Sequence, residues 1–552
     1  MSAMKWWGWG PEGVEFTHAD KPDLAPFIEK VLGLKVGAPT APPPRFEELE
    51  VPESRLPDGL REALERAVTP AFVSVDPEDR VVHGRGKSVR DLILQRRGDL
   101  GRVVDAVLRP VDEAQVAEIL RAALSFDAVV IPFGGGSSIS GSLEPDPGET
   151  RPILSVDLAR LDRVVEIDHA SRLARVQAGV KGPALEEQLG AAGYTMGHLP
   201  DSFPHSTLGG WIATRSSGMQ SDRYGDVADL TKGLRVVTPS GTLVVRPLPA
   251  TSTGPSVREM VLGSEGRLGI ITEATVQVHR LPEQRTILGY LFPTFAEGLA
   301  AMRDLAAHGC PVSVTRVSDA NETQFSFALR QNPTALDRVQ SWALRQYLRR
   351  RRGFDVHAMC LSFIGYEGSP RQVAARRRTV GRIVKAHGGL CIGSGPGALY
   401  DRKKFDTPYI RDFLLDRGGV GDVSETAMPW SRMTAVYDAV SAAAADAFDR
   451  LGVRGYFMCH LSHSYHAGAC LYFTFAFVPS PGADMTTQYD VVKSAVQQSF
   501  VDQGATLSHH HAVGTEHSRW LEQDISVPGV AMLEALFDGT DPGRHLNPGK
   551  IV

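Results

Sequence analysis

The chain of 552 residues is long enough for two or three domains of ordinary size. Its 59 basic and 64 acidic residues leave a net charge of −5, so it lacks the overall positive field of nucleic-acid-binding proteins. The five cysteines show no C-x-x-C spacing, which argues against a disulfide framework or a zinc site and favours a reduced, intracellular setting.

We expect neither a membrane-spanning helix nor a secretory signal peptide from this sequence. It has no run of about 18 apolar residues, which a membrane-spanning helix requires. The first ten residues include Trp6, Trp7 and Trp9 but not the apolar stretch of a signal peptide, and we expect these tryptophans to pack on a domain surface. We therefore predict a cytoplasmic protein that is not secreted and binds no nucleic acid, and we leave a homodimer open as its assembly.

The predicted elements begin with an N-terminal arm and helical segment, residues 1–90, in which residues 38–58 are proline-rich and extended. In residues 91–283, short β-branched runs alternate with helical patterns. They predict strands at 103–108, 128–131, 153–158, 164–167, 174–178 and 270–278, and helices at 113–123 and 184–192. This segment is typical of a domain that mixes α and β structure.

Residues 284–500 show a different rhythm. The strand-like runs 286–292 and 359–364 lead into the helix-like runs 295–307 and 371–386, which predicts a sheet covered by helices. Residues 501–552 carry a run of histidines and a Pro-Gly ending, and we expect them to return to the first domain. The predicted fold class is therefore α+β.

A glycine-rich turn at Pro132–Ser138 (PFGGGSS) is the first chemical signal. It follows a predicted buried strand, and three consecutive glycines remove every β-carbon from the turn. Backbone N–H groups can then approach a diphosphate closely, and the two serine hydroxyls can donate further hydrogen bonds. On its own, this turn is equally well explained as a plain glycine-rich connection between a strand and a helix.

Three later segments complement this turn. Residues 200–218 are dense in small and hydroxyl side chains and can lie flat against a planar ring. Residues 263–273 (GSEGRLGIITE) place Gly269 at the start of a strand, where the backbone can approach a ligand. At the C-terminus, Asn547 precedes Pro548, which predicts an extended residue whose amide reaches a ring carbonyl.

In this order, the four segments resemble the FAD-binding domain of the vanillyl-alcohol oxidase and p-cresol methylhydroxylase superfamily. Within it, the chain resembles the alkyldihydroxyacetonephosphate synthase family from residue 4 to its end, including YIRD at 409–412, SETAMPW at 424–430, AGACLYF at 467–473 and SHHHAVG at 508–514. The resemblance implies a two-part FAD-binding domain at 91–283 and an α/β cap domain over the flavin ring at 284–500. It also implies noncovalent FAD, although His83 and His205 are candidates for a covalent link.

The resemblance further implies which residues line the flavin. They are Pro132, Gly134, Gly135, Gly136, Ser137, Ser138, Pro200, Asp201, Ser202, Ser206, Thr207, Gly210, Ala213, Thr214, Ser216, Glu265, Gly269 and Ile271, joined by Asn547 from the C-terminal segment.

The histidine run His509, His510 and His511 concentrates groups that can transfer protons near pH 7. In an extended segment, His509 and His511 would share one side and His510 would face the other. A metal site is the alternative, but the sequence shows no second cluster of ligands nearby, and we predict no metal. The resemblance makes the run an active-site element in which each histidine is a candidate acid or base.

Three further residues match functional positions of the family. Tyr472 lies in a strand-like run, Cys470–Phe477, and matches the family's acid/base tyrosine, although without the resemblance it would be taken as a core residue. Arg316 matches an arginine at the flavin site, and Arg411 matches one that binds substrate, where a guanidinium suits a phosphate or carboxylate. Tyr465 is a further candidate for substrate binding.

The implied reaction exchanges the acyl chain of acyl-dihydroxyacetone phosphate for a fatty alcohol through an adduct at flavin N5, without net oxidation. The alternative is an FAD-dependent oxidase or dehydrogenase of a 2-hydroxy acid such as D-lactate or glycolate, because the ending LNPGK at 546–550 resembles that branch. A non-catalytic flavin-binding protein is a third hypothesis. Ala512 and Thr515 depart from the family's glycine and basic residue, which weakens the case for a phosphate on the substrate.

Residues 334–348 have apolar positions at helical spacing and precede four consecutive arginines, Arg349–Arg352. A basic amphipathic helix of this kind can rest on an anionic membrane surface. A helix packed on the cap domain with a solvated basic end explains the pattern equally well. Peripheral membrane contact would suit a lipid-like substrate.

Overall fold

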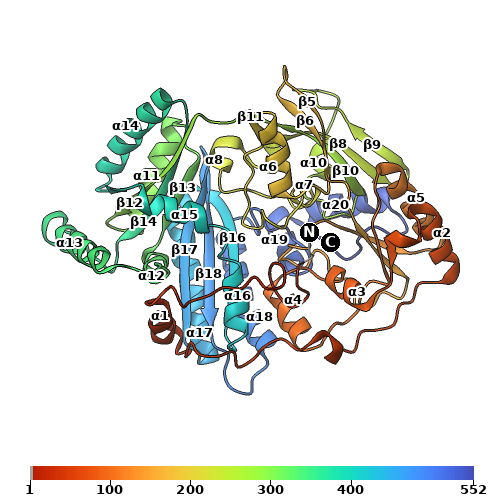
Figure 1. Ribbon diagram of the computed structural model, residues 1–552, viewed down its shortest axis with the longest axis horizontal. Helices are drawn as coiled ribbons and strands as arrows, with labels where there is room; N and C mark the ends of the chain where they lie inside the picture. The colour runs from red at the N-terminus through yellow and green to blue at the C-terminus, as the bar shows by residue number, and fades with distance from the viewer. Residues whose placement is uncertain (1–3) are drawn as a thin grey trace.

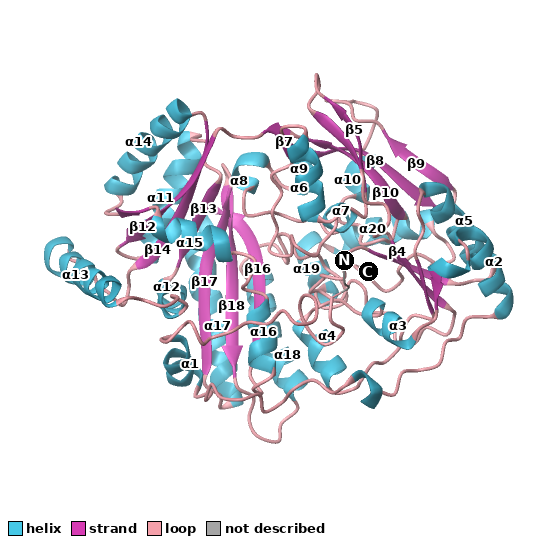
Figure 2. Ribbon diagram, viewed as in Figure 1, coloured by secondary structure: helices cyan, strands magenta, loops and turns pink. Residues whose placement is uncertain are grey.

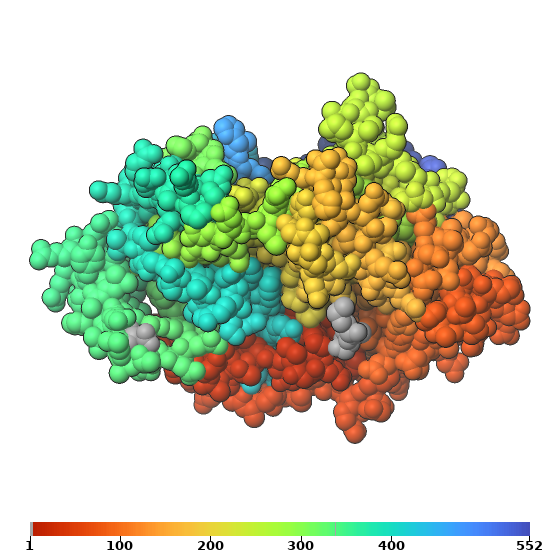
Figure 3. Space-filling view, turned by 45° about the horizontal axis from the view of Figure 1, so that its top comes forward, coloured from red at the N-terminus to blue at the C-terminus, as the bar shows by residue number. Residues whose placement is uncertain are grey.

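The N-terminal segment of the computed structural model, which describes residues 4–552, wraps around the rest of the chain. Its helices are α1 (Leu24–Leu32), α2 (Asp58–Val68), α3 (Pro77–His83) and α4 (Val89–Arg96). Between α1 and α2 the proline-rich stretch is extended except for one 3-10 turn, η1 (Phe46–Glu48). Trp6 and Trp9 are buried and Trp7 is half-buried, so these tryptophans pack against the rest of the protein. In Figure 3 this segment, in red, runs along the lower edge of the molecule beneath the green and cyan cap residues.

Two sheets form the half of the molecule that follows. One has the order β1-β2-β4-β3, with β2, β4 and β3 parallel, and the other has the antiparallel order β5-β6-β10-β8-β9. Helix α5 begins where the Asp112 side chain accepts a hydrogen bond from the N–H of Gln115, and its inner face packs between the sheets. The strands are β1 (Val73–Ser74), β2 (Ala106–Leu108), β3 (Val129–Phe133), β4 (Ile153–Asp157), β5 (Val164–Asp168), β6 (Leu173–Gln177), β8 (Thr231–Thr238), β9 (Gly241–Val245) and β10 (Ile270–Gln277).

Helices connect these strands. They are α5 (Glu113–Ser125), α6 (Gly182–Ala191), α7 (Leu208–Ala213), α8 (Ser221–Tyr224), α9 (Val227–Leu230) and α10 (Val257–Val261), with a small ribbon of β7 (Tyr194–Thr195) and β11 (His279–Arg280). In Figure 1, α6 and α7 approach the centre of the molecule and α5 lies at its right edge. The predicted strand at 103–108 is shorter than expected, because Asp105 is buried and its carboxylate bonds Arg102 and the N–H of Ile153.

The second half is a seven-stranded sheet of order β15-β12-β14-β13-β17-β18-β16 in which every pairing is antiparallel. Helices α11, α14, α17 and α18 contribute to the large apolar core on one face of it, so the predicted sheet covered by helices is confirmed. Figure 2 shows this sheet in magenta, with helices packed beside it. The strands are β12 (Gln284–Phe292), β13 (Val314–Ser318), β14 (Cys360–Gly368), β15 (Leu390–Gly393), β16 (Val420–Pro429), β17 (Gly455–Ser464) and β18 (Gly468–Phe477).

Strand β18 contributes one face to the apolar core and the other face to a cavity. Phe473, Phe475 and Phe477 are fully buried in the core on the helical side, and Tyr472 and Thr474 alternate with them and line a cavity on the other side. The helices of this half are α11 (Phe295–His308), α12 (Ala320–Ala328), α13 (Ala335–Arg352), α14 (Pro370–Ala386), α15 (Gly395–Lys403), α16 (Tyr409–Leu415), α17 (Met433–Leu451) and α18 (Met485–Asp502).

The C-terminal segment returns to the first half through α19 (Leu521–Ile525) and α20 (Val527–Thr540). The N–H of Val130 donates to the carbonyl of His545 at 2.7 Å, and the N–H of Asn547 donates back to Val130 at 2.9 Å. The last residues therefore lie beside β3, directly before the glycine turn. Residues 4–552 include no helix with both the length and the apolar character needed to cross a membrane.

Candidate active site

A cavity of about 1300 Å³ lies where the two halves meet. Every residue that the sequence predicts for cofactor binding lines it, from four segments far apart in the chain: 132–138, 200–216, 265–271 and Asn547. Of the other predicted site residues, Arg316, Arg411, Tyr472, His510 and His511 also line it. The structure thus brings almost the whole predicted site into one space.

The glycine turn is packed so closely that side chains would not fit. A β-carbon on Gly135 would lie 2.0 Å from the carbonyl oxygen of His205, and one on Gly134 would lie 2.3 Å from Oγ1 of Thr207. Gly136 has φ 66°, in the left-handed region that favours glycine. The turn and residues 200–207 therefore form one wall of the cavity in direct backbone contact.

Asn547 differs from the prediction. Its φ is 39°, not extended, and its amide donates to the carbonyl oxygens of Ser142 at 3.0 Å and Glu265 at 2.7 Å, so neither N–H is left for a ring carbonyl. The restriction that Pro548 places on Asn547 is outweighed by these two buried bonds. Its Oδ1 is buried without a donor among residues 4–552, which leaves an acceptor for a ligand N–H at the cavity wall.

Across the sheet, a row of polar side chains centres on Tyr472. Strand pairing places Glu425 opposite Tyr472 on one side and His460 opposite it on the other. The rings of His460 and Tyr472 stack with centroids 4.9 Å apart. His460 Nδ1 lies 2.9 Å from a carboxylate oxygen of Glu322, which also pairs with Arg316.

These contacts set the charge of the row. Burial raises the pKa of the Tyr472 phenol well above its usual range, so the group stays neutral and carries its proton. Burial would also raise the pKa of Glu322, but His460 and Arg316 outweigh it and lower this pKa to about 2. Burial lowers the pKa of His460 and favours its neutral form. The row therefore combines a neutral phenol and imidazole with a fixed ion pair.

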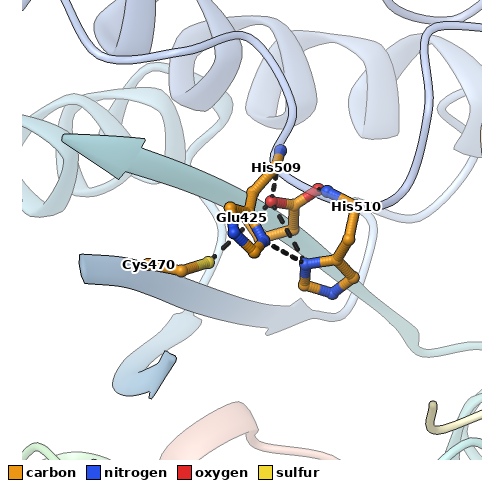
Figure 4. A group of neighbouring side chains, drawn as sticks. All are labelled: Glu425, Cys470, His509 and His510. Atoms are coloured by element: carbon orange, nitrogen blue, oxygen red, sulfur yellow. Dashed lines mark hydrogen bonds and ion pairs between the residues drawn. The ribbon is translucent and has the colours of Figure 1, made fainter. Parts of the chain in front are cut away.

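The histidine run is not extended, so the predicted alternation of its side chains is wrong. The carboxylate of Glu425 accepts the N–H groups of His509, His510 and His511 at 2.6, 3.0 and 3.0 Å, and this curls the three residues around it. As a result, both His510 and His511 face Tyr472, with ring centroids at 6.0 and 5.5 Å. Figure 4 shows Glu425 with His509, His510 and Cys470 gathered around it.

One possible ligand atom from each of four side chains lies within 4.8 Å of the other three; the side chains are Glu425, Cys470, His509 and His510. The Glu425 oxygens already accept the three backbone N–H groups and the hydroxyl of Ser508 at 2.8 Å. Hydrogen bonding alone therefore accounts for the cluster, and the absence of a metal stays a prediction.

His509 and Tyr465 do not line the cavity; they lie behind it. The Tyr465 hydroxyl donates to Asp226 at 2.8 Å and lies 2.6 Å from Nε2 of His509, whose Nδ1 is 2.9 Å from Nδ1 of His510. A chain of groups that can exchange protons thus leads from half-buried Asp226 to the cavity wall at His510. Tyr465 is placed to support this chain rather than to touch a substrate.

Arg411 forms part of a cationic corner of the cavity. It is buried, donates from Nη1 to the carbonyl of Lys87 at 2.9 Å, and lies over the Trp9 ring at 5.3 Å. Its Nε has no partner among the described residues, so the guanidinium keeps a donor for an anion. Thr515, by contrast, bonds Glu144 at 3.3 Å and does not line the cavity, so this departure from the family pattern removes no cation from its wall.

Part of the cavity wall, which we call the apolar branch, comes from the N-terminal segment and the cap. Its apolar side chains are Phe16, Phe27, Ile28, Val31, Leu32, Phe325, Phe327 and Leu344, and Asp20, Lys21 and Gln331 of the same segments also line the cavity. Since hydrocarbon gains free energy by leaving water for such a surface, this branch suits a long alkyl or acyl chain.

Sequence reasoning missed several residues of the site. Glu322, His460 and Asp226 carry no motif of their own and are revealed only by strand pairing and loop contacts. Glu425 lies inside the SETAMPW segment, which pointed to the family but not to a role for this carboxylate. The two candidates for a covalent flavin link, His83 and His205, do not line the cavity.

Comparisons with known proteins agree with this geometry. Residues 104–245 match a family described as FAD binding domain, and residues 281–551 match FAD linked oxidases, C-terminal domain. Alkyldihydroxyacetonephosphate synthases of Dictyostelium discoideum and Trypanosoma brucei brucei are 36% and 33% identical over 100% of this chain and 93% and 92% of their own. The predicted cofactor, FAD, is confirmed.

Solved structures show the same fold. A structure of alkyldihydroxyacetonephosphate synthase superposes with a TM-score of 0.86 at 33% identity and covers 99% of this chain and 98% of its own. A structure of p-cresol methylhydroxylase superposes with a TM-score of 0.66 at 14% identity over 91% and 98%, which shows the fold alone. A mitochondrial D-lactate dehydrogenase (cytochrome) of Arabidopsis thaliana is 23% identical over 87% of this chain and 78% of its own.

Proposed function

Because the chain belongs to the alkyldihydroxyacetonephosphate synthase family, we propose that it replaces the acyl chain of acyl-dihydroxyacetone phosphate with a fatty alcohol, releasing the fatty acid and forming an ether. The observation that carries this proposal is one cavity that joins a flavin wall, a cationic corner and an apolar branch. A small 2-hydroxy acid would need no apolar branch. The reaction balances without an oxidant, because one chain leaves as the acid and the other enters as the alcohol.

Separate groups transfer the protons and bind the substrate in the proposed reaction. FAD, when bound, would supply an electron-accepting ring for the substrate carbon that the acyl chain leaves and the alcohol joins. The neutral phenol of Tyr472 gives and takes a proton at that carbon and its substituents, and His510 and His511 exchange this proton with the chain behind them. Arg411 holds the phosphate through its free Nε, and Arg316, fixed by Glu322, orients the polar end of the substrate.

Product analysis tests this proposal. The purified holoenzyme is incubated with acyl-dihydroxyacetone phosphate and hexadecanol, and mass spectrometry follows the ether and the free fatty acid. We expect the two products to appear in equal amounts. Fatty acid without ether would mean hydrolysis and would contradict the proposal.

We further propose that the protein is cytoplasmic and touches the membrane surface through α13. In Figure 1 this helix projects from the left side of the molecule. Leu344 and Leu348 anchor it to the cap, while Leu336, Val339 and Trp342 are more than half exposed. The last turn of the same helix is the basic end Arg349–Arg352. Exposed apolar side chains beside a basic cluster suit a surface with anionic lipids.

Vesicle flotation tests the membrane contact. The wild type should float with vesicles that contain 30 mol% phosphatidylserine, and the variant with Arg349–Arg352 changed to Glu should remain unbound. A variant with the exposed arginines Arg377 and Arg378 of α14 changed to Glu is the control for charge alone. Equal flotation of all three proteins would contradict this contact.

A further inference from the structure

The loop that carries the histidines has no regular hydrogen bonding of its own and is held by two carboxylates. From the cap sheet, Glu425 accepts the N–H groups of His509, His510 and His511. From the flavin-binding half, Glu265 accepts those of Val513 at 2.9 Å and Gly514 at 3.0 Å. Between them, Ala512 has φ 73°, which reverses the chain where the family has a glycine.

Glu425 is the stronger of these anchors. Its Oε1 accepts the Ser508 hydroxyl and two backbone N–H groups, and its Oε2 accepts a third. Burial alone would raise the pKa of this carboxyl, but the neighbouring histidines lower it well below its usual range, so it stays ionised. An ionised carboxylate that accepts several N–H groups holds a loop far more firmly than a neutral acceptor does.

The same charge acts on the rings. Carboxylate oxygens of Glu425 lie 3.6 Å from Nδ1 of His510 and 3.5 Å from Nδ1 of His511. Burial lowers the pKa of His510 to about 3 and that of His511 to about 4, and Glu425 opposes this shift in both. The other titratable or charged groups facing the loop are Asp226, His463, Tyr465, Cys470, Tyr472, Lys493 and His517.

We propose that Glu425 is a positioning residue of the active site: it shapes residues 508–511 so that two histidine rings face Tyr472, and its charge keeps those rings able to take up a proton during turnover. This inference rests on the proposed function, because it assigns Glu425 to the proton transfer of that reaction. Glu425 itself does not line the cavity.

The test compares Glu425→Gln, Glu425→Asp and Ser508→Ala with the wild type. Glu425→Gln keeps the size of the side chain but removes the charge. We expect its kcat to fall by about 10²-fold, the scale of a lost general acid or base. The limb of the pH profile that reports the histidines should move about 1 unit or more to lower pH, because an imidazolium loses its counter-charge. Ser508→Ala removes one anchoring bond and keeps the charge, so kcat should fall less than tenfold with the limb unchanged.

Bound flavin, measured by absorbance at 450 nm, shows whether each variant is folded. A flavin-loaded Glu425→Gln enzyme within threefold of wild type and with the wild-type pH profile overturns the inference. If Glu425→Gln binds no flavin, Glu425→Asp decides: it keeps the charge but draws the carboxylate back from the loop by one methylene, so its kcat should fall further than that of Ser508→Ala. Flavin-loaded Glu425→Asp with the wild-type kcat and pH profile contradicts the role of Glu425. The proposed function fails in a different way, since then the wild type itself forms no ether.

Discussion

Replacing Gly135 by Ala tests whether the glycine turn forms the flavin wall. The new β-carbon would lie 2.0 Å from the His205 carbonyl and 2.9 Å from the Cα of Ser206, and both contacts are to backbone, which cannot rotate away. The turn and residues 200–207 must therefore move apart. Overpacking of this kind costs about 1–3 kcal/mol, and if that cost falls on the flavin-bound form it weakens FAD binding by roughly 5- to 150-fold.

The assay is flavin titration of the apoprotein, followed by quenching of flavin fluorescence. Gly190→Ala is the matched control, because Gly190 lies in α6, has no atom within 4 Å of its added β-carbon and adopts ordinary helical geometry. We expect Gly190→Ala to bind FAD as the wild type does, with a slightly higher melting temperature from the better helix propensity of alanine. FAD affinity of Gly135→Ala within twofold of wild type would refute the assignment of this turn to the flavin wall.

Two further predictions concern substitutions in the row of polar side chains around Tyr472. Tyr472→Phe should lower kcat by about 10²-fold or more while flavin binding is unchanged, since only the hydroxyl is removed; steady-state rates within threefold of wild type would exclude an acid/base role. Glu322→Ala leaves Arg316 and His460 buried without their partner, which should cost about 3–5 kcal/mol of stability. A thermal melt should show it as a drop of several degrees, whereas Glu62→Ala, which breaks an exposed pair with Arg66, should leave the melting temperature unchanged.

The sequence predicted those parts of the site that depend on local chemistry. Three adjacent glycines, read together with the later segments, predicted a close backbone approach, and the structure shows that approach at Gly135. Alternation of apolar residues along 470–477 predicted a strand, and its period of two places Tyr472 on the cavity side. Strands and helices with clear periodicity were located to within a few residues.

The parts it could not predict depend on contacts between distant segments. The extended histidine run was expected from local geometry, but Glu425, more than 80 residues earlier, curls it through three backbone bonds. Asn547 was expected to be extended because a proline follows it, but two buried carbonyls hold it in the left-handed region. No single-sequence pattern encodes which strand lies opposite which, and the row from Glu425 to Arg316 exists only through that pairing.

The most direct test of the central claim is an anaerobic absorbance measurement of the bound flavin during turnover. The holoenzyme is mixed with acyl-dihydroxyacetone phosphate and hexadecanol in one arm and with D-lactate or glycolate in the other. The account predicts ether formation in the first arm with oxidised flavin at the end of the reaction, and no bleaching at 450 nm in the second. Bleaching by a 2-hydroxy acid, with no ether in the first arm, would contradict it and identify a dehydrogenase.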